Sequence, residues 1–128
     1  MGYVSTMVGV QAVVELVVTA DDTAESMRAS DVAVLGTPRV VALCEEATMC
    51  ALADRLSEGK TSVGSRVELS HLAPVAIGST VRATATLERT EGRRLIFSVS
   101  VTDACGLVAA GRVTRVVVDK SHFINKAR

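Results

Sequence analysis

The chain has 128 residues, and its fourteen basic and fourteen acidic residues cancel to a formal net charge of zero. Because domains commonly run to about 100–150 residues, this length predicts a single domain over residues 1–128. No basic run is interleaved with aromatic residues, which argues against nucleic acid as the main partner. The chain is 48% hydrophobic but only 2% aromatic, so Val, Ala and Leu must fill its core.

The N-terminal part of the sequence indicates neither export nor membrane insertion. No basic segment precedes its apolar residues, and Glu15 interrupts them, so this stretch is predicted to be a strand and not a signal peptide. No run of about 18 apolar residues predicts a membrane span. The cysteines are odd in number and lack metal or redox spacing, and two are expected to be buried in a helix: Cys44, Cys50 and Cys105. With only two histidines, no structural zinc site is expected, and the cytoplasm is the expected compartment.

The pattern of residues predicts one strand, one long helix and then four further strands. Thr37 is expected to cap the helix, with Pro38 in its first position and Gly59 closing it. Around this helix, residues of β-strand type alternate along four later segments separated by short turns. The predicted ranges are a strand at 8–19, a polar segment at 20–33 with a helical turn at 23–27, a helix at 36–57, strands at 63–72, 80–87, 95–101 and 107–118, and a charged surface tail at 119–128.

This order predicts an α+β fold in which an antiparallel sheet wraps around the central helix. The short turns favour a meander of the four later strands. One helical stripe should face the sheet, formed by Val40, Leu43, Cys44, Ala47 and Ala51. The helix has further apolar residues beside this stripe, so a second copy of the chain is expected to cover them in a homodimer.

The two central acids of the helix are expected to differ in environment. Glu46 falls among small and partly polar residues, whereas Glu45 falls among Val41, Met49 and Leu52. A carboxylate in an apolar setting resists ionisation unless a partner holds it, and can then serve as an acid or base near neutral pH. The alternative is a solvated surface Glu beside long apolar neighbours.

Three further polar residues are candidates for chemistry. Thr37 lies where free backbone N–H groups gather at a helix start, although it could be an N-cap and nothing more. His71 ends the apolar face of the second strand, so with Glu45 it could activate water, or it could simply bond a loop carbonyl. Arg115 lies on the same face as Val113 and Val117, where it needs an anionic partner or must extend to solvent. No nucleophile elbow, phosphate loop, dinucleotide fingerprint or HExxH motif is present.

Four segments together resemble the hotdog-fold thioesterases, and among them the fluoroacetyl-CoA thioesterase subgroup. They are TPRVVALCEEA, TSVGSRVELSHLAPVAIGSTV, EGRRLIFSVSVTD and GRVTRVVVD, and they span about residues 35–123. The resemblance implies a dimeric hotdog fold, leaves open the pairing of dimers into a tetramer, and places the catalytic set on Thr37, Glu45 and His71. It also implies that Gly64 and Arg115 contact the acyl group. No metal or redox cofactor is implied, since coenzyme A is part of the substrate.

The implied activity is hydrolysis of an acyl-CoA of small or medium acyl group to the free acid and coenzyme A. The segment between the first strand and the helix is short and has no aromatic residue, whereas the fluoroacetyl enzymes have a longer, aromatic-bearing lid there. A general acyl-CoA thioesterase is therefore expected and not one selective for fluorinated acyl groups. The alternatives are a non-catalytic acyl-CoA or small-ligand binding protein, a hydratase or dehydratase, and a purely structural dimerisation domain.

Overall fold

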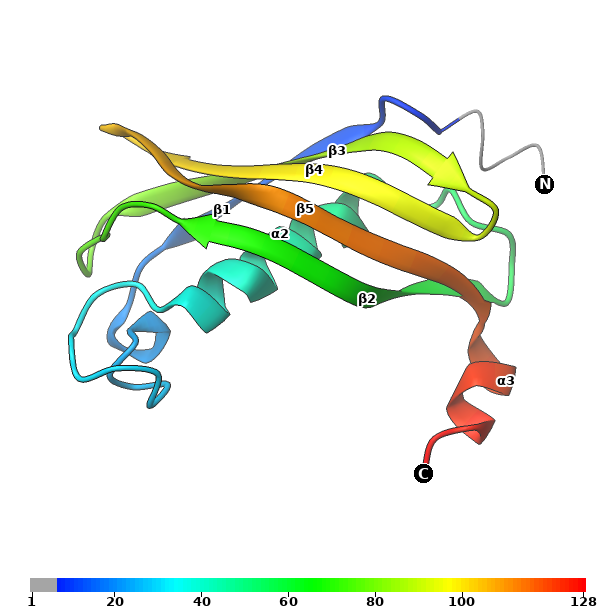
Figure 1. Cartoon of the computed structure of the whole chain (residues 1–128), viewed down its shortest axis with the longest axis horizontal. Coiled ribbons are helices and arrows are strands. Elements are labelled where there is room, and N and C mark those ends of the chain that lie inside the picture. Colours follow the sequence, from blue (N-terminus) through cyan, green and yellow to red (C-terminus); the bar gives the residue numbers. More distant parts are fainter. Residues whose placement is uncertain (1–6) are drawn as a thin grey trace.

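The structure, a computed structural model, describes residues 7–128. A five-stranded antiparallel sheet lies over one long helix, α2, and a short helix, α3, extends from the far end of the sheet (Figure 1). Within the described part of the chain no helix is long and apolar enough to cross a bilayer. The elements are β1 (Gln11–Val17), η1 (Ala20–Asp22), α2 (Thr37–Ala51), β2 (Lys60–His71), β3 (Thr80–Glu91), β4 (Arg94–Asp103), β5 (Gly106–Asp119) and α3 (Lys120–Asn125).

Helix α2 is shorter than predicted and is capped differently. Its N-cap is Gly36, in extended conformation, so Thr37 is the first helical residue and Pro38 the second. A Cβ on Gly36 would lie 3.0 Å from the backbone of Ala24, which explains the glycine. At the other end α2 stops at Ala51, because the chain soon turns through Asp54, whose φ is +61°.

The helical stripe predicted to face the sheet is confirmed. All five of its members are buried: Val40, Leu43, Cys44, Ala47 and Ala51. Burial raises the pKa of the Cys44 thiol to about 11, as befits an inert core thiol. Cys50, in contrast, is exposed, so the prediction that both helical cysteines are buried was wrong for it.

The sheet order is β1-β3-β4-β5-β2. Strands β3, β4 and β5 form the predicted meander through tight turns at Gly92 and Gly106, both with positive φ. The prediction that β2 joins this meander beside β3 was wrong. Residues 72–79 carry the chain across the molecule, so β2 pairs with β5 and leaves its other edge open.

A bulge in β2 changes which residues face the helix. Gly64 pairs with Arg115 and Arg66 with Thr114, so Ser65 is an extra residue with no partner in β5. The prediction of unbroken alternation from Val63 to His71 was therefore wrong. The bulge brings Gly64 onto the same face as His71, the face that packs on α2.

The segment before α2 is held by Asp22. Its carboxylate accepts hydrogen bonds from the backbone and hydroxyl of Thr19, at 2.8 and 2.9 Å, and from Arg39 Nε of α2 at 3.0 Å. Burial opposes ionisation, but these donors together hold the pKa of Asp22 below its usual range. The carbonyl of Asp22 also accepts from Gly36 N–H, so this residue positions the start of the helix.

We predict that Asp22→Asn lowers the free energy of unfolding by about 1–3 kcal/mol at pH 7. A lowered native pKa stabilises the fold above the unfolded value near pH 4. This stabilisation is lost as the pH falls through the lowered pKa of Asp22 in the folded protein. The difference in free energy of unfolding between Asp22→Asn and the parent should therefore shrink at low pH. Urea unfolding at pH 7 and pH 3 measures both effects, with the exposed Asp21→Asn as the matched control. Equal stability of Asp22→Asn and parent at pH 7 would contradict this role.

Candidate active site

Two groups of polar side chains lie along the seam between α2 and β2. The first joins the start of the helix to the end of the strand. Thr37 Oγ1 lies 2.8 Å from His71 Nδ1, although the two residues are 34 positions apart in sequence. Since Gly36 caps the helix, the hydroxyl of Thr37 is free for this contact, and the prediction of an N-cap role for Thr37 was wrong.

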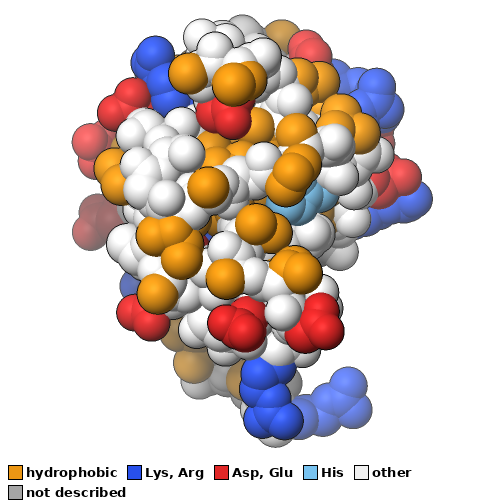
Figure 2. Space-filling model, turned by 90° about the vertical axis from the view of Figure 1, so that its left-hand side faces the viewer, with side chains coloured by type: hydrophobic (Ala, Val, Ile, Leu, Met, Phe, Trp, Pro, Cys, Tyr) orange, Lys and Arg blue, Asp and Glu red, His pale blue; other side chains and the backbone are white. Residues whose placement is uncertain are grey.

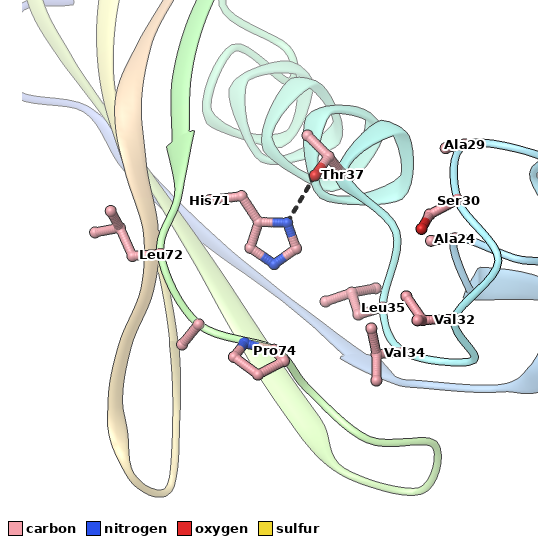
Figure 3. Close-up of a pocket in the computed structure, with 11 residues that line it drawn as sticks. Ala24, Ala29, Ser30, Val32, Val34, Leu35, Thr37, His71, Leu72 and Pro74 are labelled. Carbon is pink, nitrogen blue, oxygen red and sulfur yellow. Dashed lines mark hydrogen bonds between the residues drawn. The ribbon is translucent and has the colours of Figure 1, made fainter.

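The other ring nitrogen of His71 has no hydrogen-bond partner among residues 7–128, although it is buried. Figure 3 shows Nδ1 of the ring directed toward Thr37, with Leu35 and Pro74 on the other side of the ring. It lines a pocket of about 360 Å³ whose other walls come from the segment before α2 and the loop after β2. A buried imidazole nitrogen without a partner is unusual, because most buried polar atoms form a hydrogen bond, and it singles out this end of the pocket as a candidate site.

The mouth of this pocket is mostly apolar. Figure 2 shows the pale blue histidine surrounded by hydrophobic side chains, with charged residues further out. The lining includes Val32, Val34, Leu35 and Leu72, with Ser30 as a polar member. Such a surface suits an aliphatic group, and the polar pair Thr37–His71 lies at its edge.

The second group surrounds Glu45, two helical turns beyond Thr37. Its Oε2 lies 3.4 Å from Arg115 Nη1, and its carboxylate lies directly against Gly64 of β2. The carboxylate is partly accessible, with 38% of the side chain exposed, whereas only 5% of the Arg115 side chain is exposed. Burial lowers the pKa of Arg115, and Glu45 opposes this shift. Of the two predicted settings for Arg115, an anionic partner or extension to solvent, the structure shows the anionic partner.

Ser62 fixes the orientation of Arg115. Its hydroxyl accepts from Arg115 Nε at 2.8 Å, and its carbonyl accepts from Nη2 at 2.9 Å. Thr48 Oγ1 lies 3.4 Å from Nη1. Strict alternation along β2 places Ser62 on the face away from Arg115, and only the bulge at Ser65 brings it to the face that packs on α2, so the sequence pattern does not reveal it.

Of the predicted site residues, the structure thus brings Thr37 together with His71, and Glu45 together with Gly64 and Arg115. No hydrogen bond or ion pair links Glu45 to His71 within residues 7–128. Thr37 and Glu45 nevertheless lie on the same helix, eight residues and so about 12 Å apart along its axis, and Thr37 contacts His71 of β2. A ligand lying along the seam could meet both groups.

The described residues contain no cluster of three or more His, Cys, Asp or Glu side chains suited to a metal ion. The chemical groups available at the seam are therefore a carboxylate, an imidazole, a hydroxyl and a guanidinium. A carboxylate or imidazole can accept a proton from water, and buried donors can stabilise an oxyanion.

Comparison with known proteins identifies the family. Residues 18–121 match the family model of the fluoroacetyl-CoA-specific thioesterase. The chain belongs to this thioesterase family. The fluoroacetyl-CoA thioesterase of Streptantibioticus cattleyicolor is 36% identical over 95 residues, which cover 74% of this chain and 68% of that protein. Membership places the chain among the thioester hydrolases.

Solved structures of the family share this architecture. A fluoroacetyl-CoA thioesterase structure superposes with a TM-score of 0.87 at 31% identity, covering 93% of each chain. A thioesterase superfamily member from Thermus thermophilus gives 0.85 at 33% identity, covering 92% of this chain and 88% of that one. A hot-dog-like protein from Thermanaerovibrio acidaminovorans gives 0.86 at 30% identity, with coverage of 93% and 88%. The predicted hotdog fold is confirmed.

Proposed function

We propose that the protein hydrolyses acyl-CoA thioesters of small or medium acyl groups to the free acid and coenzyme A. Thr37, Glu45 and His71 would be its catalytic residues, and Gly64 and Arg115 would contact the acyl group. The observation that carries this proposal is the contact of His71 with Thr37 at 2.8 Å, which leaves the second ring nitrogen buried beside a pocket and without a partner. The family relationship supports the acyl-CoA class of substrate.

In this proposal Thr37 selects the useful tautomer of His71. If His71 Nδ1–H donates to Thr37 Oγ1, the lone pair of Nε2 is free to accept a proton. A water molecule would then attack the carbonyl carbon and pass its proton to Nε2. The tetrahedral intermediate collapses with cleavage of the C–S bond, and the thiolate leaves as coenzyme A.

Glu45 has two possible roles in the same reaction. As a base it would accept the proton of the attacking water in place of His71. As a nucleophile it would attack the carbonyl carbon and expel the thiolate, forming a short-lived anhydride that water then hydrolyses. Arg115 and the backbone at Gly64 would hold the carboxylate against β2 in either case. No metal or redox cofactor is needed, because water and side chains supply every reacting group.

The proposal includes a homodimer. The outer side of α2 stays open in the single chain, where Met49 is 45% exposed, and the free edge of β2 lies beside it. A second copy seated there would cover this apolar surface and close the seam around Glu45. Three free cysteines without disulfide partners agree with a cytoplasmic setting.

A panel of acyl-CoAs of increasing chain length tests the activity, with released thiol followed by a thiol-reactive dye. We expect release of coenzyme A from short and medium acyl groups, since the pocket beside His71 has a volume of about 360 Å³. Binding of acyl-CoA without release of thiol would overturn the proposal in favour of a non-catalytic binding protein.

Gly64→Ala tests the contact between Gly64 and Glu45. The new Cβ would lie 2.5 Å from Glu45 Oε2, so the carboxylate must move while the backbone stays. We expect the rate of thioester hydrolysis to fall by about tenfold to a hundredfold, because a small displacement of a catalytic group has an effect of this size. The Tm should change little.

The control for Gly64→Ala is Gly111→Ala, whose Cβ would collide with the backbone carbonyl of Glu68 and should lower Tm instead. Turnover of Gly64→Ala at the parent rate would contradict the proposed placement of Glu45.

A further inference from the structure

A second cavity with a different character lies at the far end of the sheet. It has a volume of about 210 Å³ and is formed where the start of β2, the turn before β4 and the end of β5 meet α3. Figure 1 shows α3 at this end, away from the segment that precedes α2. Its lining residues are Lys60, Arg93, Val118, Asp119, His122, Phe123 and Lys126.

The charge of this cavity is uncompensated, although the whole chain is neutral. Three cationic side chains face one carboxylate, and that carboxylate already accepts from His122 N–H and Ser121 Oγ as the cap of α3. Within residues 7–128, none of Lys60, Arg93 or Lys126 forms an ion pair. Unpaired cations around a concave surface suit a phosphate group.

The cavity also contains an exposed aromatic ring. Phe123 is one of only two phenylalanines in the chain, and 44% of it is exposed. A phenyl ring offers a face on which a nucleobase can stack. Phosphate-binding cations beside an open aromatic ring therefore point to a nucleotide that carries phosphate groups.

The path from this cavity to Glu45 runs along one face of the sheet. Lys60 pairs with Asp119 at the cationic cavity, and Gly64 pairs with Arg115 beside Glu45. Each strand therefore runs four residues between the cavity and Glu45. Four residues of strand span about 13 Å. Because side chains two and four residues apart share a face, Lys60 lies on the face of Ser62 and Gly64, the face that meets α2.

A further hollow bridges the two places. It has a volume of about 330 Å³, and Lys60 lines it as well as the cationic cavity. Its other end is formed by Met49 and Ser62, which both contact Arg115. The hollow thus runs from the two residues that contact Arg115, the partner of Glu45, to Lys60 at the cationic cavity.

We propose that the cationic cavity binds the phosphate-bearing nucleotide end of coenzyme A, with its pantetheine arm in the bridging hollow. This inference rests on the proposed acyl-CoA substrate, because it places the thioester at Glu45 and Gly64. Lys60, Arg93 and Lys126 hold the phosphates, and Phe123 packs against the adenine.

The test is titration calorimetry of 3′,5′-ADP, coenzyme A and pantetheine with the full chain and with the double variant Arg93→Ala/Lys126→Ala. Both residues are exposed, so the fold should persist, and circular dichroism verifies it. We expect the double variant to bind 3′,5′-ADP and coenzyme A about tenfold to a hundredfold more weakly, and pantetheine as the parent does. Arg112→Ala, which removes an exposed cation outside the cavity, is the matched control.

Kinetics give a second readout that separates this inference from the proposed function. The ratio of KM for acyl-CoA to KM for acyl-pantetheine should rise about tenfold in the double variant. Unchanged binding of 3′,5′-ADP and an unchanged KM ratio would overturn the nucleotide site while leaving the hydrolase intact. The parent could instead hydrolyse no thioester while the double variant loses 3′,5′-ADP binding. That pair of results would support the nucleotide site and refute the proposed function.

Discussion

Replacing Glu45 with Gln should lower kcat for acyl-CoA hydrolysis by about a hundredfold to ten-thousandfold, the range that proton transfer by a positioned side chain contributes. The amide keeps the shape of the carboxylate but cannot accept a proton or attack a carbonyl carbon. Arg115 would retain its hydrogen bonds to Ser62, so the variant should fold. Steady-state release of thiol measures kcat, and a thermal melt verifies the fold.

The matched control for this substitution is Glu46→Gln, which makes the same change at the next helical position. Glu46 is exposed and contacts neither Arg115 nor Gly64, so its variant should turn over at the parent rate. If Glu45→Gln and Glu46→Gln both kept kcat within a few-fold of the parent value, a catalytic role for Glu45 would be contradicted.

Replacing His71 with Asn should reduce kcat by a similar factor of about a hundredfold to ten-thousandfold. The Asn amide can still meet Thr37 Oγ1 where His71 Nδ1 lies, but nothing replaces the second ring nitrogen. The variant therefore separates the hydrogen bond from the proposed proton acceptor. The measurement is kcat at saturating acyl-CoA, compared between His71→Asn and the parent.

Two further changes isolate the contribution of Thr37 and the specificity of the effect at His71. Thr37→Ser keeps the hydroxyl and should retain most of the activity. Thr37→Val removes the hydroxyl and should lower kcat, as His71→Asn does. Ser70→Ala, on the exposed face of β2, should leave turnover unchanged. Full activity of both His71→Asn and Thr37→Val would mean that their contact serves structure alone.

The sequence predicts the existence of the helix and the different surroundings of its two acids, although not its end or its cap, because both predictions depend on local geometry. Residues on one helix share a fixed geometry, so the wheel places Glu45 and Glu46 in different environments without knowledge of the fold. In the structure Glu45 meets Gly64 and Arg115, while Glu46 is exposed. The strand segments follow from alternation for the same reason.

What the sequence could not supply depends on contacts between distant residues. No local sequence signal identifies Ser65 as the extra residue of a bulge, yet this bulge places Gly64 and His71 on the same face of β2. Gly36 replaces Thr37 as the cap because Ala24 packs against it, which frees the Thr37 hydroxyl for His71. The place of β2 beside β5 likewise depends on how residues 72–79 cross the molecule.

The central claim is that a thioester lies along the seam between α2 and β2, within reach of both polar groups. A crystal structure with a non-hydrolysable thioether analogue of acyl-CoA tests it most directly. We predict that the carbonyl carbon lies within about 4 Å of the Glu45 carboxylate or of a water held by His71, in one chain or across a dimer. An acyl group bound away from this seam, with Glu45 and His71 both facing bulk solvent, would contradict the account.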